Sequence, residues 1–173
     1  MTVYYGPGAN GSGIAEMIGY LNGVNYPGFI GINTLLTKIF GVVFAVSSRL
    51  CIGKEGPLGH IGSIMGLLPI YVPIEGFGFR TMQNDFTKRQ LIAAGGSAGV
   101  AAAFGAPIGG ALFAYEMSKT SSFWTFSMIW KTFITCSFAV LLLGILQTLA
   151  EGKLTDGFSG STLKFGNLKL DGF

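Results

Sequence analysis

The sequence predicts an all-α membrane protein, a polytopic bundle of tilted and broken helices, from three observations. Half of the 173 residues are hydrophobic, only 11% are charged, and the mean hydropathy is +0.56. Glycine accounts for 28 residues, which is typical of membrane helices that pack closely through small side chains. Several uncharged stretches are long enough to form helices. We therefore interpret residues 1–150 as a transmembrane region and residues 151–173, which lack a helical period, as a loop or short extended segment outside the bilayer.

The first two apolar segments predict one long helix and one short helix. Residues 34–52 form a long apolar segment whose only charges are Lys38 and Arg49, and we expect both of these side chains to reach the membrane interfaces. Residues 57–72 follow, bounded by Pro57 at the start and by Pro73 directly after the end. This segment is shorter than the roughly 20 residues that a perpendicular span needs. It therefore predicts a helix that stops inside the protein.

The third apolar segment, residues 90–115, has no charge and consists mostly of Gly and Ala. The dipeptide Ala106-Pro107 should break this segment into two shorter helices, because proline disrupts a helix interior. Four glycines have the four-residue spacing that permits close helix contact. They are Gly95 with Gly99, and Gly105 with Gly109.

The last apolar segment, residues 132–150, predicts the plainest transmembrane helix of the chain. Aromatic side chains come directly before it and indicate a belt at the membrane interface. They are Phe123, Trp124, Phe126 and Trp130.

Charge and cysteine content exclude several classes of function. The 11 basic and 8 acidic residues are scattered along the chain, with a net charge of +3 and no basic block, so no nucleic-acid partner is indicated. Cys51 and Cys136 lie in apolar stretches without metal-ligand spacing, and we interpret both as small buried hydrophobic residues. No metal or cofactor is expected. The first residues lack the basic and apolar parts of a secretory signal, so insertion would rely on internal helices.

One glycine motif suggests an enzyme but lacks the necessary context. The segment Gly6-Pro7-Gly8-Ala9-Asn10-Gly11 formally satisfies the dinucleotide-binding fingerprint. A true fingerprint follows a strand and has an acidic residue about 20 positions later. Asn25, Tyr26 and Pro27 occupy that region here. We therefore do not expect an enzyme.

Two other glycine motifs predict an anion site. Gly11-Ser12-Gly13 would form a turn that places the Ser12 hydroxyl at a helix N-terminus, where it and nearby amides can meet an anion; a plain Ser N-cap is the alternative. The second motif, Gly53-Lys54-Glu55-Gly56-Pro57, can direct successive N–H groups toward one point, with the proline in the first turn of a helix. Glu55 could occupy that anion position itself. The alternative is a hydrated interfacial loop, but ionisable residues inside a membrane favour function.

Two further polar residues have structural interpretations. His60 lies one turn into the helix that follows the second motif, and we predict a hydrogen-bonded packing residue there. Glu116 ends the small-residue stretch near Lys119, and an ordinary interfacial ion pair explains it.

These motifs make the chain resemble the CLC family of chloride channels and chloride/proton exchangers. Gly11 to Glu16 looks like the family motif GSGIPE, and Gly53 to Pro57 is identical to a common form of its GK/REGP motif. Gly95 to Glu116 resembles the family's long pair of small-residue helices. The segment before the second motif, YLNGVNYPGF, and SSFW after the third look most like the eukaryotic lysosomal and vacuolar branch.

The resemblance implies a chloride path within part of an inverted repeat. Chloride would be bound and selected by both motifs, through Gly11, Ser12, Gly13, Lys54, Glu55 and Gly56. Glu55 would be the gate, because its ionised carboxylate mimics chloride and blocks the path until it is protonated or displaced. Serine in the first motif is the family's chloride-preferring choice over nitrate. The resemblance also implies a homodimer in the lipid bilayer and favours an intracellular endomembrane over the plasma membrane, with chloride as the transported ligand.

Departures from the family pattern leave the transport mode open. Ala15 stands in place of the motif proline, which should loosen the start of that helix. Met117 stands where the exchangers carry an internal proton-transfer glutamate, so the acid is absent and a voltage-gated channel is favoured over a proton-coupled exchanger. The family's membrane unit is much longer than this chain, which predicts a fragment holding most of the first half. A non-transporting membrane scaffold is therefore an alternative of another class.

Overall fold

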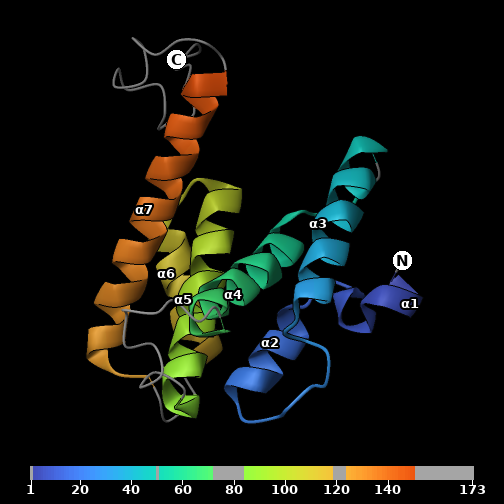
Figure 1. The fold of residues 1–173 in the computed structure, drawn as a ribbon. Helices are drawn as coiled ribbons and strands as arrows, with labels where there is room; N and C mark the ends of the chain where they lie inside the picture. Colours follow the sequence, from blue (N-terminus) through green and yellow to red (C-terminus); the bar gives the residue numbers. More distant parts are fainter. Residues whose placement is uncertain (1, 50, 72–83, 119–123, 151–173) are drawn as a thin grey trace, which may run out of the picture.

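The computed structural model describes residues 2–49, 51–71, 84–118 and 124–150, and every regular element in these ranges is helical (Figure 1). The predicted all-α class is therefore confirmed. The expected segment at residues 151–173 lies outside the described ranges. In chain order the elements are α1 (Thr2–Tyr5), the 3-10 turn η1 (Pro7–Ala9), α2 (Ile14–Leu21), α3 (Ile32–Ser47), α4 (Glu55–Tyr71), α5 (Asp85–Phe104), α6 (Pro107–Ser118) and α7 (Phe126–Ala150).

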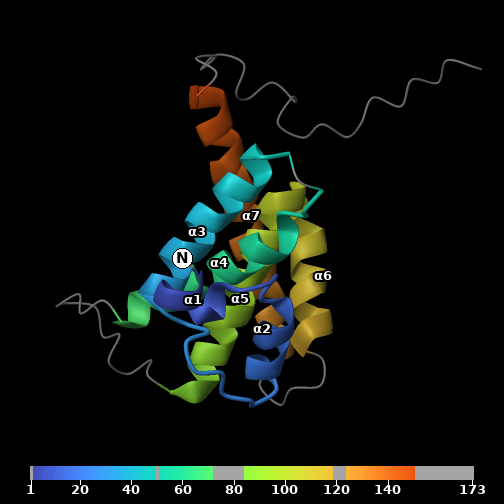
Figure 2. The same cartoon turned by 90° about the vertical axis from the view of Figure 1, so that its right-hand side faces the viewer.

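Helix α5 lies at the centre of the bundle. Helix α4 crosses it on one side, while α6 and α7 pack on the other (Figure 1). The short helix α2 packs against α4, α5 and α6, and α3 packs beside α4 (Figure 2). A core of apolar side chains joins α2, the loop after it, and the helices from α4 onward. Its large buried side chains include Met17, Leu21, Phe29, Leu67, Ile92 and Met128.

Glycines bring the backbones of α4 and α5 into direct contact. A methyl group on Gly62 would lie 3.1 Å from the carbonyl carbon of Gly95, and a methyl group on Gly95 would meet Gly62 in the same way. A methyl group on Gly99 would lie 2.9 Å from the carbonyl carbon of Leu58. The close contact predicted for Gly95 and Gly99 is thus confirmed. Side chains at these positions would force the two helices apart.

The predicted break of the small-residue stretch is also confirmed. Helix α5 ends at a left-handed Gly105 with φ of 66°. Helix α6 begins at Pro107, a position where an N–H would have no acceptor within the helix, so proline loses no hydrogen bond there. The close contact predicted for Gly105 and Gly109 is wrong. Among the described residues, nothing lies within 4 Å of a methyl group placed on Gly105, and only Ala106 lies near one on Gly109. Gly110 makes the close approach instead, because a methyl group placed on it would lie 2.6 Å from the Ala101 methyl.

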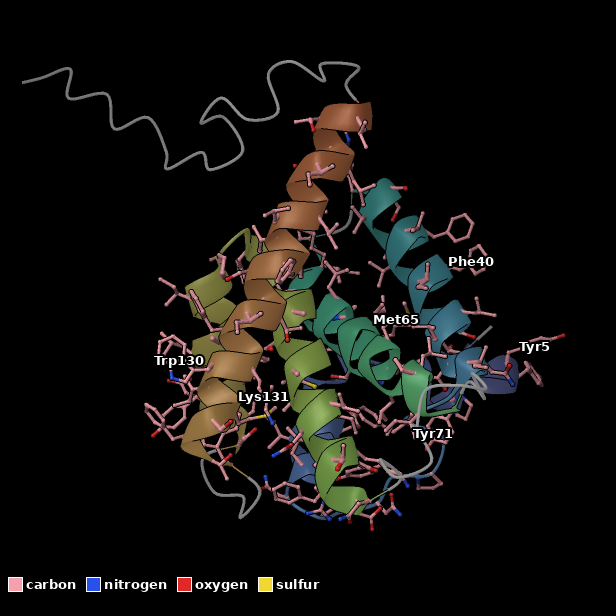
Figure 3. The ribbon with its side chains drawn as sticks, turned by 60° about the vertical axis from the view of Figure 1, so that its left-hand side comes forward. Tyr5, Phe40, Met65, Tyr71, Trp130 and Lys131 are labelled. Atoms are coloured by element: carbon pink, nitrogen blue, oxygen red, sulfur yellow. The ribbon has the colours of Figure 1, made fainter. Side chains whose placement is uncertain are left out.

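Helix α7 is 25 residues long and is the one described helix long and apolar enough to cross a membrane, judged by length and composition. It begins six residues earlier than predicted, so Phe126 and Trp130 of the expected aromatic belt belong to the helix itself. Phe123 lies outside the described residues. Figure 3 shows Trp130 on α7 and Phe40 on α3 pointing away from the helices on opposite sides of the molecule.

Other predicted boundaries and environments need correction. Helix α3 ends at Ser47 instead of continuing to residue 52, and α4 begins at Glu55 instead of Pro57. Cys136 is buried as predicted, but Cys51 follows the end of α3 and is exposed. The reason for the Cys51 error is that apolar sequence continues past the point where the helix ends.

Candidate anion-binding site

The turn around Ser12 leads directly into helix α2. Gly13 occupies the N-cap position with a left-handed φ of 82°, which glycine adopts readily. The Ser12 hydroxyl oxygen accepts a hydrogen bond from the Ile14 N–H at 3.3 Å. The structure assigns the N-cap position to Gly13, one residue later, while the Ser12 hydroxyl makes a local hydrogen bond of the kind that the capping alternative describes. The exposed hydroxyl keeps its own hydrogen for donation to an anion.

The second motif forms the N-terminus of helix α4. The Leu58 N–H donates to the Lys54 carbonyl at 3.0 Å, which closes the first turn. The N–H groups of Glu55 and Gly56 precede this bond in the sequence, so they have no carbonyl acceptor within the helix, as at any helix start. The Glu55 side chain is half-buried, and its carboxylate turns back over Gly53, with Cδ 3.6 Å from a methyl group placed there. The Lys54 side chain is exposed.

The structure brings the two motifs together although 43 positions separate Ser12 from Glu55 in the sequence. A methyl group on Gly56 would lie only 2.7 Å from Cβ of Ser12 and 3.3 Å from Cδ1 of Ile14. The N-termini of α2 and α4 therefore meet at one point. Both helix starts carry partial positive charge and N–H groups that have no carbonyl acceptor within their own helix, which is a suitable environment for an anion.

His60 packs against the junction of α2 and α4. Its ring is fully buried, stacks on Phe29 with centroids 4.4 Å apart, and places Nε2 3.0 Å from the Phe29 carbonyl oxygen. The backbone of Gly13 packs directly on the ring, because a methyl group there would lie 2.6 Å from the His60 Cγ. The prediction of a hydrogen-bonded packing residue is confirmed. The spacing of His60 in the sequence gave no sign of its contact with Gly13.

Lys38 also supports the junction, and the expectation that it reaches a membrane interface is wrong. The side chain is only 3% exposed. Its Nζ donates to the Gly11 carbonyl at 2.8 Å and to the Ala9 carbonyl at 3.2 Å. Helix α3 thus carries a cation inward to the loop that precedes Ser12. The only sequence signal was a lysine within an apolar helix.

The remaining candidate, Met117, lies away from solvent in the apolar core. It is 6% exposed and belongs to the same buried cluster as Met17 and Met128. Its neighbour Glu116 is exposed on α6, while Lys119, the predicted partner, lies outside the described residues. Within the ranges that the structure describes, no group of three His, Cys, Asp or Glu residues could hold a metal ion.

Comparisons with known proteins extend over nearly the whole chain. A family model described as voltage gated chloride channel matches residues 1–165. Chloride channel protein D of Dictyostelium discoideum is 44% identical over 160 residues, covering 90% of this chain and 16% of that protein. Chloride channel protein CLC-a of Arabidopsis thaliana is 37% identical over 171 residues, covering 95% of this chain and 22% of that protein. The chain thus spans about a fifth of the length of these relatives.

Proposed function

We propose, because this chain belongs to the voltage-gated chloride channel family, that it forms part of a chloride path in a longer membrane protein. Ser12 binds the transported anion with its hydroxyl and with the amides at the start of α2. The amides of Lys54, Glu55 and Gly56 form a neighbouring anion position, and Gly11 and Gly13 shape the turn. The observation that carries this proposal is the contact between Ser12 and Gly56, which joins two helix starts.

Glu55 acts as the gate in this proposal. Its carboxylate already folds back toward the start of its own helix, over Gly53, where it competes with an anion for the same N–H groups. Partial charges at helix ends bind an anion without a full counterion at that position, so the anion can also leave. Protonation or displacement of the carboxylate would open the position. Chloride is preferred to nitrate because serine stands in the first motif.

The first test is chloride binding to the purified chain, followed by the broadening of the chloride NMR signal. Replacing Ser12 with Ala removes one hydroxyl donor to an anion, and such a hydrogen bond is worth about 1.5–3 kcal/mol. We expect chloride affinity to fall about tenfold or more, since 1.4 kcal/mol is a factor of ten. Ser48→Ala is a matched control, because Ser48 is exposed at the end of α3 and its hydroxyl donates locally to the Ala45 carbonyl. Equal affinity in wild type and Ser12→Ala would remove the site from this chain.

We further propose a passive channel as the transport mode. Met117 is buried among apolar side chains, and a thioether does not carry a proton, so this position offers no internal proton-transfer acid. Proton-coupled exchange is the second candidate, favoured by the resemblance of the flanking segments to the intracellular branch. The discriminating assay is chloride flux from liposomes loaded with the full-length protein, with proton movement recorded in parallel. We expect no coupled proton uptake, and a fixed proton to chloride ratio would establish exchange instead.

The proposal also covers the oligomeric state of the full-length protein and the membrane that holds it. A homodimer in an intracellular endomembrane is expected from the family resemblance. An apolar groove of about 540 Å³ between α6 and α7, lined by Leu112, Tyr115, Phe126 and Trp130 among others, lies away from Ser12 and Glu55. It supplies apolar surface for lipid or for a second copy without involving the anion site.

A further inference from the structure

We propose that the polar pocket between the end of α2 and the start of α5 binds a phosphorylated polyol, with Arg89 holding the phosphate group. The ligand is either the headgroup of a membrane lipid or a soluble phosphate ester, because both carry this chemistry. The pocket lies at the end of α2 that is remote from Ser12, so this inference does not rest on the proposed chloride path.

The pocket is small and its lining is largely polar. Its volume is about 240 Å³, which is below the usual range for drug-sized ligands but much larger than a single halide ion needs. The walls come from two segments, residues 20–25 at the end of α2 and the first turns of α5. The lining residues are Tyr20, Gly23, Val24, Asn25, Asp85 and Arg89. A compact polar molecule therefore fits this space better than a simple ion or a lipid chain.

Arg89 supplies a positive charge that has no counterion among the described residues. The neighbouring Lys88 pairs with Asp85 at 3.6 Å, whereas no described carboxylate lies within 4.0 Å of the Arg89 side chain. The half-buried guanidinium lies over the backbone of Gly23, where a methyl group would be 3.8 Å from Nη2. The charged groups at the start of α5 also act electrostatically on Tyr20. Arg89 is thus available to an anion that enters the pocket.

The other donors of the lining favour phosphate among the anions that a guanidinium binds. Arginine holds either phosphate or carboxylate through two parallel hydrogen bonds. The Tyr20 hydroxyl and the Asn25 amide line the same pocket, and no hydrogen bond within the described residues uses either side chain. Both groups can donate to an anion. A phosphate group still has oxygen acceptors for them after it has bound Arg89, whereas a carboxylate has fewer.

Asp85 favours a ligand that carries hydroxyl groups beside the phosphate. Its carboxylate lines the pocket, only accepts hydrogen bonds, and would repel a bare phosphate ion. The hydroxyl groups of a glycerol or inositol phosphate could donate to it. The ion pair with Lys88 compensates part of its negative charge. The lining therefore fits a phosphate ester of a polyol better than inorganic phosphate.

The α2 side of the pocket is built before any ligand binds. The Gly23 N–H donates to the Tyr20 carbonyl at 3.1 Å, and the Val24 N–H donates to the Gly19 carbonyl at 2.9 Å. The Tyr20 ring stacks on the buried Phe29 ring, with centroids 6.1 Å apart. Groups that are already held in place lose little conformational freedom when a ligand binds.

The place of the pocket in the bundle suits a membrane headgroup. Figure 1 shows the end of α2, the start of α5 and the start of α7 at the same end of the bundle. The first turns of α7 carry the exposed Trp130 and Lys131 (Figure 3), and such residues are typical of a membrane interface. A membrane crossed by α7 would therefore place its headgroups near this pocket.

The experiment measures ligand binding to the purified 173-residue chain in detergent by isothermal titration calorimetry. The soluble probes are glycerol phosphate and inorganic phosphate, and the lipid probes are a short-chain phosphatidylinositol phosphate and a short-chain phosphatidylcholine. Arg89→Gln removes the charge and the planar fork, Arg89→Lys keeps the charge alone, and Tyr20→Phe removes the hydroxyl. Lys131→Gln is the matched control, because it removes one exposed positive charge at the start of α7, outside the pocket.

Wild type should bind a phosphorylated polyol more tightly than inorganic phosphate or phosphatidylcholine. Arg89→Gln should weaken this binding about tenfold or more, because hydrogen bonds to a charged group are lost. Arg89→Lys and Tyr20→Phe should each weaken it about threefold, and Lys131→Gln should stay within about twofold of wild type. Tighter binding of the phosphatidylinositol phosphate would identify the bilayer as the source, and tighter binding of glycerol phosphate would identify a soluble ester.

Four results would overturn the inference. They are binding of neither polyol phosphate to wild type, tighter binding of inorganic phosphate than of both, equal binding to wild type and Arg89→Gln, and an equal loss in Lys131→Gln. The last result would show that general surface charge explains the binding. A helical circular dichroism spectrum equal to wild type is the condition for including each variant. If Arg89→Gln does not fold, Arg89→Lys takes its place, and wild-type affinity in Arg89→Lys would then overturn the inference.

The chloride site and this pocket fail independently. Ser12→Ala should keep wild-type affinity for the phosphorylated probe, and Arg89→Gln should keep wild-type affinity for chloride. Loss of phosphate binding in Ser12→Ala would contradict a separate pocket. Unchanged chloride binding in Ser12→Ala would contradict the proposed chloride path and leave the Arg89 pocket as it is.

Discussion

Replacing Glu55 with Gln is expected to make chloride transport by the full-length protein insensitive to external pH. The glutamine keeps the size of the side chain but carries no negative charge, so it does not compete with chloride at the start of α4. Hydrogen bonds to a charged group are worth about 1.5–3 kcal/mol, so removing this competitor should raise transport at high external pH about tenfold. The measurement is chloride efflux from liposomes over a series of external pH values. Wild type should slow as the pH rises, because more of its carboxylate is ionised.

The control for this prediction is Asp85→Asn, which also replaces one carboxylate by an amide. Asp85 is exposed at the start of α5, where it pairs with Lys88 at 3.6 Å. Transport in this variant should keep the pH dependence of wild type. An unchanged pH profile in Glu55→Gln would show that the gate lies elsewhere, even if Ser12 binds the anion.

Replacing Gly13 with Ala is expected to abolish most chloride binding and to lower the stability of the chain. The left-handed backbone at φ of 82° costs a non-glycine residue roughly 1–2 kcal/mol. The new methyl group would also lie 2.6 Å from Cγ and 2.9 Å from Cβ of His60, and such overpacking costs about 1–3 kcal/mol. Because Gly13 follows Ser12 directly, relief of this clash must displace the turn that holds the hydroxyl. Chloride NMR and the midpoint of thermal unfolding measure the two effects.

Gly28→Ala separates the two causes. Gly28 has nearly the same φ, 80°, but no described atom lies within 4 Å of a methyl group placed there. It should therefore lose stability through its backbone alone and keep chloride binding. The double variant Gly13→Ala with His60→Ala should regain part of the lost binding, since the ring that meets the methyl group is gone. If Gly28→Ala lost binding equally, contact with His60 would not be the reason.

Much of the fold could be predicted because composition and helix-breaking residues are local signals. The uncharged stretch around Ala106-Pro107 predicted two helices, and the structure places the break there. The family resemblance drawn from the glycine motifs is confirmed by the comparisons. Helix ends were less predictable, since apolar sequence continues from α3 into the loop that contains Cys51.

The support of the candidate site could not be predicted, because it depends on contacts between distant segments. A lysine in an apolar helix is expected to extend toward the interface, and nothing in the sequence places Lys38 beside the carbonyl of Gly11. The contacts of Gly13 with His60, and of Gly56 with Ser12, likewise require the packing of α2 against α4. The functional roles assigned to Ser12 and Glu55 remain predictions that await the measurements described above.

The glycine contact between α4 and α5 limits how a gate at Glu55 can work. Where two backbones touch without intervening side chains, neither helix can slide or tilt without steric collision, and Gly62 and Gly95 create this condition two turns below the gate. The backbone that carries the Glu55 carboxylate is therefore held rigidly against α5. If Glu55 is the gate, opening would come from rotation of its side chain about its own bonds, with the contact between α4 and α5 unchanged.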